Sequence, residues 1–377
     1  MLTIQTAISC NLDPNILLAA LPLFEAEKVE AIEWSFDTLY KIKEIPVWFL
    51  ELLQTYSSAN RLIGHGVYFS LFSGKWSQAQ QEWLLQLQQL SKQFKFEHIT
   101  EHFGFMTGEN FHTGAPLSVP FTTKTLVLGQ DRIKRISNAC NCAVGLENLA
   151  FAYTNDDVKK HGDFLAKLVE PVNGFIILDL HNLYCQLHNF NINYDDIIKN
   201  YPLELVREIH VSGGSWQDSV TDPGKQIRRD THDDAVPDEV FQLLQQTIPK
   251  CLNLKYVVLE QLGNALDTPG KRTMFQNDYN KLHQIIQSIK EVNHVINNFL
   301  PSTITIDINP VEDEALFKQQ NQLSSILESA SSYEHALQLL HQSGFSNTDW
   351  QIENWKQYML ETAIGIAQKW KHGFVND

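Results

Sequence analysis

Short apolar runs alternate along the chain with longer stretches in which apolar residues recur at helical spacing. Such runs, when they are rich in β-branched and aromatic residues, are typical of buried β-strands. Before residue 290 the chain contains eight of them: TIQTAIS from Thr3, VEAIEWSF from Val29, RLIGHGVYFSL from Arg61, FEHITEHFGF from Phe96, VGLENLA from Val144, GFIILDLHN from Gly174, VREIHVSGG from Val206 and KYVVLEQL from Lys255. The pattern predicts eight strands separated by helices.

The stretches between these runs have the pattern of amphipathic helices. In WSQAQQEWLLQLQQLSKQF and VFQLLQQTIPKCL the apolar residues fall on one helical stripe: Trp83, Leu84, Leu87 and Leu90 in the first, and Val240, Leu243, Leu244 and Ile248 in the second. Eight strands that alternate with helices favour a closed parallel (β/α)8 barrel of the TIM type, in the α/β class, over an open sheet. Residues 1–290 agree with the roughly 250 residues typical of that fold, with allowance for long loops.

The pattern changes after Ile289. The segment HVINNFLPSTITIDINPVED indicates a connector, and the remainder is helical, with Ser331 and Glu334 spaced as in a capping box. We therefore predict a barrel domain over residues 1–290 and a connector with a C-terminal helical extension over residues 291–377. The extension is either a cap packed against the side of the barrel or a surface that holds a peptide or a partner protein.

Composition narrows the classes of function. The chain has 377 residues, of which 43% are hydrophobic, enough for one large core and a second small unit. Its formal charge of -15 argues against nucleic acid as a partner, because nucleic-acid-binding proteins gather basic side chains. The N-terminus lacks the pattern of a signal peptide, and no run is long and apolar enough to span a membrane. We expect no membrane association and a cytoplasmic location.

The five cysteines are odd in number and scattered along the chain. This arrangement favours reduced thiols over a disulfide framework. Cys140 and Cys142 form a CxC pair without a second pair at zinc spacing, so we expect free thiols there rather than a zinc knuckle.

Acidic residues and histidines gather at the ends of the predicted strands. In VREIHVSGGSWQDSVTDPGKQIRRDTHDD a strand delivers His210, and the next loop delivers Asp230 and His232, which would face the same side of an extended segment. The ends of parallel barrel strands open into one cavity, so such residues need no proximity in sequence. The candidates are His65, His102, Glu147, Asp179, His181, His210, Asp230, His232 and Glu260.

Each candidate has an ordinary structural interpretation as well as a functional one. A lone histidine such as His65 or His102 is more often a hydrogen-bonded core or loop residue than a ligand. Glu147, Asp179 and Glu260 directly follow apolar runs, and burial of an unpaired carboxylate costs several kcal/mol. Lysine and arginine are scarce at these strand ends, so a metal is the expected counter-charge.

The size of the set bears on the kind of centre. Five histidines and four carboxylates exceed the roughly four to six ligands that one ion takes, which favours two or three ions. The absence of cysteine from the set favours iron, manganese or zinc over an iron-sulfur centre.

The candidates lie in motifs whose order is informative. These are GHGVYFS, TEHFGFMTGENFHTGAPLSVPFT, LENLAFAY, LDLHNLYCQLHNFNIN, IHVSG, DTHDDAVPDEVFQLL and VLEQLGN. The series, over roughly residues 1–290, resembles the multinuclear non-haem iron-dependent oxidases, the family that contains the methanobactin biosynthesis oxidase. One departure is His181, which stands where the family usually has asparagine, and the segments VSGGSW and LEQLGN also differ from the usual pattern.

The resemblance implies a xylose isomerase-like barrel with two or three iron ions and dioxygen as co-substrate. It implies oxidation of cysteine or another residue in a ribosomally made precursor peptide, commonly with a partner protein that presents the peptide. By the same resemblance the metal ligands are the nine candidates given above, and His210 and Asp230 are also predicted to act in catalysis.

Three alternatives remain open. A metal-dependent sugar isomerase or epimerase uses the same barrel, but it needs a basic group for a sugar oxygen, and no lysine lies close to these strand ends. A phosphodiesterase of the endonuclease IV type has a similar kind of ligand set, although the charge of -15 opposes the approach of DNA. A metal-binding protein without catalytic activity is the third.

Overall fold

The computed structural model describes residues 4–39, 42, 44–108, 110–289, 297–300 and 303–372. Eight parallel strands close into a barrel in the order β1-β12-β9-β8-β7-β4-β3-β2, which confirms the predicted fold. Their bounds are β1 (Gln5–Ser9), β2 (Ala31–Trp34), β3 (Leu62–Gly66), β4 (His98–His102), β7 (Ala143–Glu147), β8 (Phe175–Asp179), β9 (Val206–Val211) and β12 (Tyr256–Leu259). Two small antiparallel pairs extend from the loops: β5 (Phe105–Met106) with β6 (Pro116–Leu117), and β10 (Trp216–Asp218) with β11 (Gln226–Arg228).

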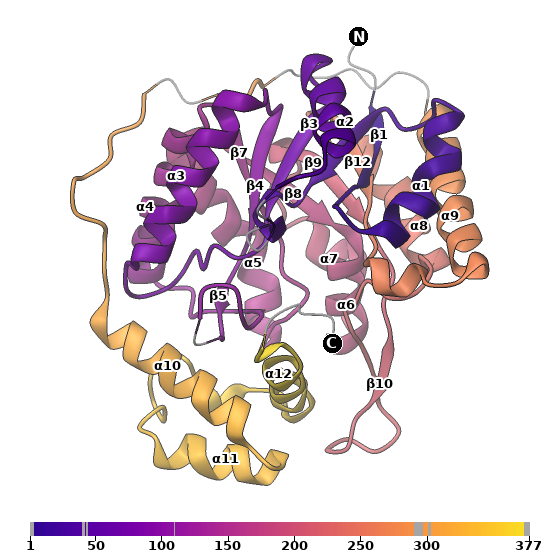
Figure 1. Ribbon diagram of the computed structural model, residues 1–377. Helices are drawn as coiled ribbons and strands as arrows, with labels where there is room; N and C mark the ends of the chain where they lie inside the picture. Colours follow the sequence, from indigo (N-terminus) through magenta and orange to yellow (C-terminus); the bar gives the residue numbers. More distant parts are fainter. Residues whose placement is uncertain are drawn as a thin grey trace.

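Helices surround the barrel (Figure 1). They are α1 (Pro14–Glu25), α2 (Val47–Ser58), α3 (Gln78–Gln93), α4 (Thr123–Cys140), α5 (Asn155–Val169), α6 (Leu180–Phe190), α7 (Tyr194–Ile198), α8 (Asp238–Thr247) and α9 (Pro269–Ser288). Short 3-10 helices occupy Phe36–Leu39, Glu170–Val172, Leu203–Leu205, Ile248–Lys250, Gly263–Leu266 and Ile352–Asn354. None of the described helices is long and apolar enough to cross a membrane.

The predicted apolar stripes face the core. Trp83, Leu84 and Leu87 of α3 are buried, as are Val240, Leu243 and Leu244 of α8 with Ile248 just after it, whereas Leu90 is only partly buried. Capping boxes start α3, α4 and α5, with Ser77, Thr122 and Thr154 as the N-cap residues. Each box satisfies backbone N–H groups that a helix start would otherwise leave without a partner.

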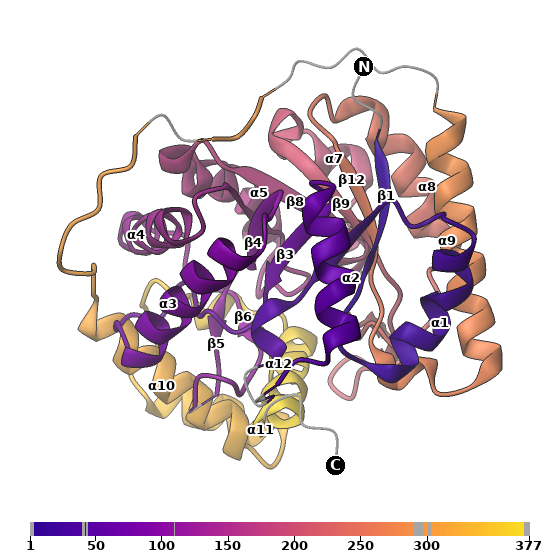
Figure 2. The same cartoon turned by 45° about the horizontal axis from the view of Figure 1, so that its top comes forward.

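Three further helices follow the barrel: α10 (Glu314–Ser329), α11 (Tyr333–Gln342) and α12 (Gln357–Trp370). Figures 1 and 2 show these helices together at one end of the barrel. The segment that leads into α10, residues 303–313, is here called the strap, and it runs along α4. Arg132 and Arg135 of α4 hold this strap by donating to the carbonyl oxygens of Val311 and Asp307, each at 2.8 Å. The predicted boundary at residues 290 and 291 lies outside the described residues.

The helical extension lies over the mouth of the barrel, not against its side. The ring of Trp355 stacks on Tyr153 with centroids 3.9 Å apart, and the Lys356 N–H donates to the carbonyl of Tyr153 at 3.0 Å. The Tyr358 hydroxyl donates at 2.8 Å to the carbonyl of Asn189, which lies in the last turn of α6. These contacts fix α12 at the end where the strands terminate.

The predicted start of α11 is wrong by one residue. Ser332, not Ser331, is the N-cap, and its hydroxyl accepts from the His335 N–H at 3.2 Å. The Ser331 hydroxyl instead lies 3.0 Å from Nδ1 of His335. Two adjacent serines compete for the capping position, and the spacing to Glu334 alone selected the wrong one.

Candidate metal centre

The register of the barrel strands brings the strand-end residues together. His102 of β4 pairs with Glu147 of β7, and Asp179 of β8 pairs with His210 of β9. Paired positions in a sheet lie about 5 Å apart, so each pair places two side chains at the same level of the barrel. Parallel strands therefore convert separate motifs into one cluster.

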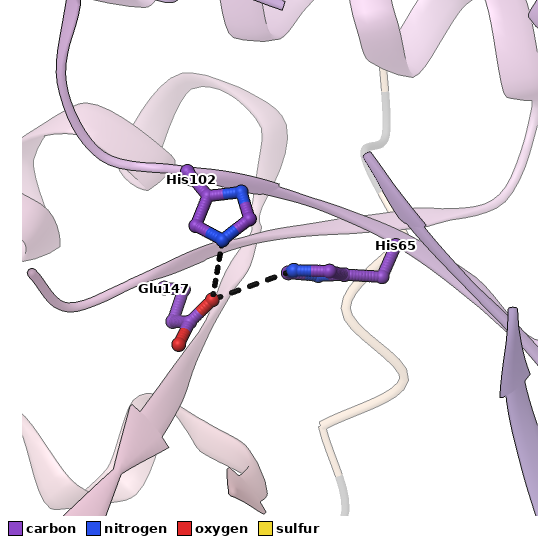
Figure 3. Close-up of side chains that lie close together, drawn as sticks. All are labelled: His65, His102 and Glu147. Atoms are coloured by element: carbon purple, nitrogen blue, oxygen red, sulfur yellow. Dashed lines mark ion pairs between the residues drawn. The ribbon is translucent and has the colours of Figure 1, made fainter. Parts of the chain in front are cut away.

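The first group is His65, His102 and Glu147, shown in Figure 3. The Nε2 atoms of both histidines lie 3.5 Å from the same carboxylate oxygen, Oε2 of Glu147. The two rings have centroids 4.6 Å apart. All three side chains thus converge on one point from β3, β4 and β7.

The contacts of the two Nδ1 atoms show which nitrogen of each histidine ring carries the proton. Nδ1 of His102 lies 3.0 Å from the carbonyl oxygen of Gly66, which can only accept, so Nδ1 carries the proton. Nδ1 of His65 lies 2.8 Å from the Thr100 hydroxyl, which itself donates to the Gly64 carbonyl and therefore accepts from the ring. Burial lowers the pKa of both histidines, which favours the neutral rings.

A neutral ring with its proton on Nδ1 presents a lone pair at Nε2. Two such lone pairs therefore face a carboxylate oxygen, and neither Nε2 of His65 nor Oε2 of Glu147 has a hydrogen-bond partner among the described residues. Three electron-rich atoms directed at one point repel each other unless a cation lies between them. The geometry fits a metal ion better than a hydrogen-bonded network.

The second group is Glu147, Asp179, His210 and Glu260, whose ligand atoms all lie within 4.8 Å of one another. Nδ1 of His210 is 3.2 Å from Oε2 of Glu260 and 3.7 Å from Oε1 of Glu147. Oδ2 of Asp179, Nδ1 of His210 and Oε2 of Glu260 are buried without a hydrogen-bond partner in the described structure. Glu147 belongs to both groups, with one carboxylate oxygen facing each.

The third set lies at the edge of the mouth. Oδ1 of Asp230 is 2.8 Å from Nε2 of His232 and 3.0 Å from Nδ1 of His181. Nδ1 of His232 lies 3.7 Å from Oε1 of Glu260, which connects this set to the second group. His232 has a φ of 51°, so the reasoning from an extended segment is wrong, although the two side chains do meet.

His181 differs from the other candidates because both of its ring nitrogens are engaged. Nδ1 contacts Asp230, and Nε2 accepts from Nε of Arg228 at 3.0 Å. Since Arg228 can only donate, Nδ1 of His181 carries the ring proton and donates to Asp230. The ring therefore orients Asp230 and presents no free lone pair to the centre in this arrangement, and the role of His181 as a ligand stays a prediction.

The electrostatics of the centre follow from crowding of acids in a buried space. Burial raises the pKa of Asp179 to about 7 and raises that of Glu147 well above its usual range. Burial also opposes ionisation of Asp230, but the neighbouring His232 and His181 hold its pKa well below the usual value. The buried acids of this cluster thus require either protons or cations.

Several residues of the cluster were not among the sequence candidates. Nε2 of His210 lies 3.1 Å from both Oε2 of Glu33 and Oε1 of Glu208, and Glu208 in turn contacts His98 at 2.5 Å. These carboxylates fix the His210 ring from inside the barrel. Their signal was present, since Glu33 and Glu208 interrupt apolar strand runs, but only residues at the strand ends were considered.

Asn182 is a further residue of the site. Its amide nitrogen donates to Oε1 of Glu147 at 3.2 Å and to the Asn148 carbonyl at 2.8 Å. Its backbone N–H donates to Oδ1 of Asp179 at 2.5 Å, because Asp179 is the N-cap of α6. The helix start thus occupies one oxygen of Asp179 and leaves Oδ2 for the centre.

A cavity of about 460 Å³ lies above the centre. The barrel contributes His102, Glu147, Asp230, His232 and Glu260 to its wall, and α12 contributes Met359, Thr362, Ile366, Lys369 and Trp370. The cluster is therefore open to a ligand on one side, beneath the C-terminal helix.

A family model described as "RiPP precursor modification enzyme MbnB/TglH/ChrH" matches residues 43–273. The chain belongs to this family. The match contains all nine candidates and runs from the segment before α2 into α9. In this chain, the region before residue 43 and the C-terminal helices lie outside the part that the MbnB/TglH/ChrH family model matches.

Relatives are similar over part of their length. A UPF0276 protein of Acaryochloris marina is 28% identical over 189 residues, which cover 49% of this chain and 64% of the relative. A UPF0276 protein of Chromobacterium violaceum is 27% identical over 151 residues, covering 40% of this chain and 52% of the relative. The matches thus span about half to two thirds of these curated relatives.

Among solved structures, a xylose isomerase domain containing protein from Salmonella typhimurium is similar with a TM-score of 0.48. The two chains are 11% identical, and the superposition covers 75% of this member of the MbnB/TglH/ChrH family and 97% of the other chain.

Proposed function

We propose that this protein is a multinuclear iron-dependent oxidase that uses dioxygen to modify a cysteine, or another residue, of a ribosomally made precursor peptide. The observation that carries the proposal is the pair of Nε2 lone pairs of His65 and His102 directed at Oε2 of Glu147, with the second group sharing that carboxylate. Membership of a family named for precursor modification supports a peptide as substrate.

We divide the proposed ligands among three positions. His65, His102 and Glu147 would hold one ion, and Glu147, Asp179, His210 and Glu260 a second. Asp230 and His232 would complete the centre at its edge, where a third ion or substrate could lie. We assign His181 to the positioning of Asp230, because both of its ring nitrogens are engaged.

Imidazole and carboxylate ligands without thiolate suit iron, manganese or zinc, and among these the resemblance to the iron-dependent oxidases favours iron. When bound, iron would supply the redox chemistry that couples dioxygen to oxidation of a substrate thiolate. The protein's residues hold and orient the reactants. Glu33 and Glu208 fix the His210 ring, and His181 fixes Asp230.

Asp230 has the position of an anionic group on the substrate side of the centre. Its side chain is 25% exposed and lines the cavity, whereas those of Glu33 and His210 are fully buried. The neighbouring His232 and His181 hold its pKa below the usual range, so it stays ionised and is a weak base. We propose that Asp230 acts in catalysis through its negative charge, which attracts a cation to the edge of the centre, while α12 excludes water from the cavity.

The sugar isomerase remains the second candidate. The sequence argument against it was the lack of a basic group near the strand ends, but Arg228 and Arg229 line the cavity. Family membership favours a precursor peptide over a sugar as the substrate. Activity on simple sugars and activity on a precursor peptide can be measured with the same preparation.

The test is co-expression of the chain with a short cysteine-containing peptide encoded beside its gene, together with neighbouring candidate partner proteins. We expect an oxygen-dependent change in the mass of the peptide. His210→Ala should abolish the change, because it removes a proposed ligand and leaves Glu33 and Glu208 buried without their shared partner.

Lys225→Gln is a matched control, because Lys225 lies on the loop between β10 and β11 and does not line the cavity. This variant should retain the mass change. An unmodified peptide from the wild-type protein, with iron bound and partners supplied, would contradict the proposal and direct attention to sugars.

A further inference from the structure

Arg228 is buried in the wall of the cavity, and no carboxylate of the described residues forms an ion pair with it. It is the last residue of β11, and only 3% of it is exposed. Nε donates to His181, but Nη2 has no hydrogen-bond partner among the described residues. The guanidinium lies against the rings of Trp216 and Tyr184, 4.9 and 5.7 Å from their centroids, which restrict its orientation.

Arg229 adds a second cation to the same wall. It donates from Nη1 to the side-chain oxygen of Gln217, a neutral acceptor, while Asp230, Asp233 and Glu361 act on its charge without forming an ion pair with it in the described structure. In the part of the chain that is described, the arginines paired with acids are Arg132, Arg135 and Arg207, all of them elsewhere. Both Arg228 and Arg229 thus line the cavity, and neither forms an ion pair with a carboxylate of the described residues.

A buried guanidinium is costly unless a matching anion accompanies it. The chain has 44 acidic residues against 29 basic ones, so a shortage of acidic partners does not explain why these arginines form no ion pair. Their unpaired state beside an open cavity indicates that the anion comes with the ligand. A guanidinium binds a carboxylate through two parallel hydrogen bonds, which Nη2 of Arg228 is free to begin.

We propose that Arg228 and Arg229 form a subsite for a carboxylate of the substrate peptide. The inference rests on the proposed function, since it takes a peptide as the substrate. The carboxylate is either the C-terminus of the peptide or an Asp or Glu side chain next to the modified residue. Arg228 connects to Asp230 through His181, so the anchored group lies beside the edge of the metal centre.

The subsite has a consequence for specificity that net charge does not predict. A protein with a formal charge of -15 attracts basic peptides at long range. Within the cavity, however, a local carboxylate is required. The favoured peptide would therefore place an acidic group or its own terminus close to the modified residue, whatever the charge of the rest.

The experiment uses the metal-loaded full chain under anaerobic conditions and three probes. These are acetyl-Gly-Ala-Cys-Ala with a free C-terminal carboxylate, the same peptide with a C-terminal amide, and the amide with its last alanine replaced by glutamate. Calorimetry at low ionic strength gives the Kd of each. We expect the free carboxylate to bind about tenfold more tightly than the first amide, as for a charge-assisted pair.

Variants locate the effect. Arg229→Gln should reduce the tenfold preference to less than about threefold, and Arg229→Lys should retain part of it, because lysine keeps the charge without the planar fork. Lys225→Gln removes the same charge outside the cavity and should leave the preference unchanged. Arg228→Gln should reduce the preference at least as far as Arg229→Gln does, and thermal unfolding reports whether each variant folds.

The glutamate probe distinguishes the two sources of carboxylate. Tight binding of this probe assigns the subsite to any nearby acid, and weak binding assigns it to the C-terminus. Equal Kd values for the free acid and the first amide, a preference that survives both arginine variants, or no binding of any probe would overturn the subsite. Because no oxygen is present, these outcomes are independent of whether the protein oxidises a peptide.

Discussion

Glu147→Gln is expected to remove more than one metal ion per chain and to lower peptide oxidation by more than about a hundredfold. Loss of a group that merely supports a ligand costs about 10- to 100-fold in metal affinity or activity, and a shared ligand should cost more. Oε2 of Glu147 faces His65 and His102, while Oε1 lies 3.7 Å from Nδ1 of His210. An amide at this position removes the negative charge from both groups. Metal analysis and the peptide mass assay measure the two effects.

Glu97→Gln is the matched control for this substitution. Glu97 pairs with Arg207 and Lys255 just before β4, at the opposite end of the strand from His102. The Glu97→Gln variant should therefore lose stability and keep its metal. Full metal content in Glu147→Gln would show that the carboxylate is structural.

The Asp230→Asn variant should lose the ion at the edge of the mouth and its activity, while it retains the ion held by His65, His102 and Glu147.

Removal of metal by a chelator is expected to lower the melting temperature by about 5 °C or more. A ligand present at a thousand times its Kd stabilises the folded state by about 4 kcal/mol, and one kcal/mol shifts the melting temperature of a large domain by a few degrees at most. Without ions, Glu147, Asp179 and Glu260 face one another in a buried space. Differential scanning calorimetry of the holoprotein and the chelated protein measures the shift.

Ferrous iron added back under anaerobic conditions should restore the original melting temperature. The same treatment of Glu147→Gln should give a smaller difference between the two states, because this variant binds less metal at the outset. Identical melting temperatures for the wild-type protein with and without chelator would contradict a buried centre that stabilises the fold.

The barrel could be predicted from the sequence because its strands are fully buried. Runs such as FIILD and YVVL have no polar face, and their even distribution between helical stretches leaves few architectures. Parallel strands end on one side, so Glu147, Asp179 and Glu260 could be placed together without knowledge of the register. The structure adds that Glu147 is central to two groups, which depends on side-chain orientation.

Other features could not be read from residue types. His181 lies in a motif beside Asp179, but its engagement depends on Arg228, which is distant in sequence. In the sequence, Arg228 and Arg229 have the appearance of exposed loop residues. They line the cavity only because the hairpin of β10 and β11 folds against it. The position of α12 was equally hidden, because an amphipathic pattern shows that a helix packs and not where. Its place over the mouth depends on contacts such as that of Trp355 with Tyr153.

We propose that several iron ions lie around Glu147. Diffraction from crystals of the iron-loaded protein, grown without oxygen and measured on both sides of the iron absorption edge, identifies the element and locates each ion. We expect at least two iron peaks, one between His65, His102 and Glu147 and another between Glu147, Asp179, His210 and Glu260. A single zinc ion, or no anomalous peak within reach of Glu147, would contradict it.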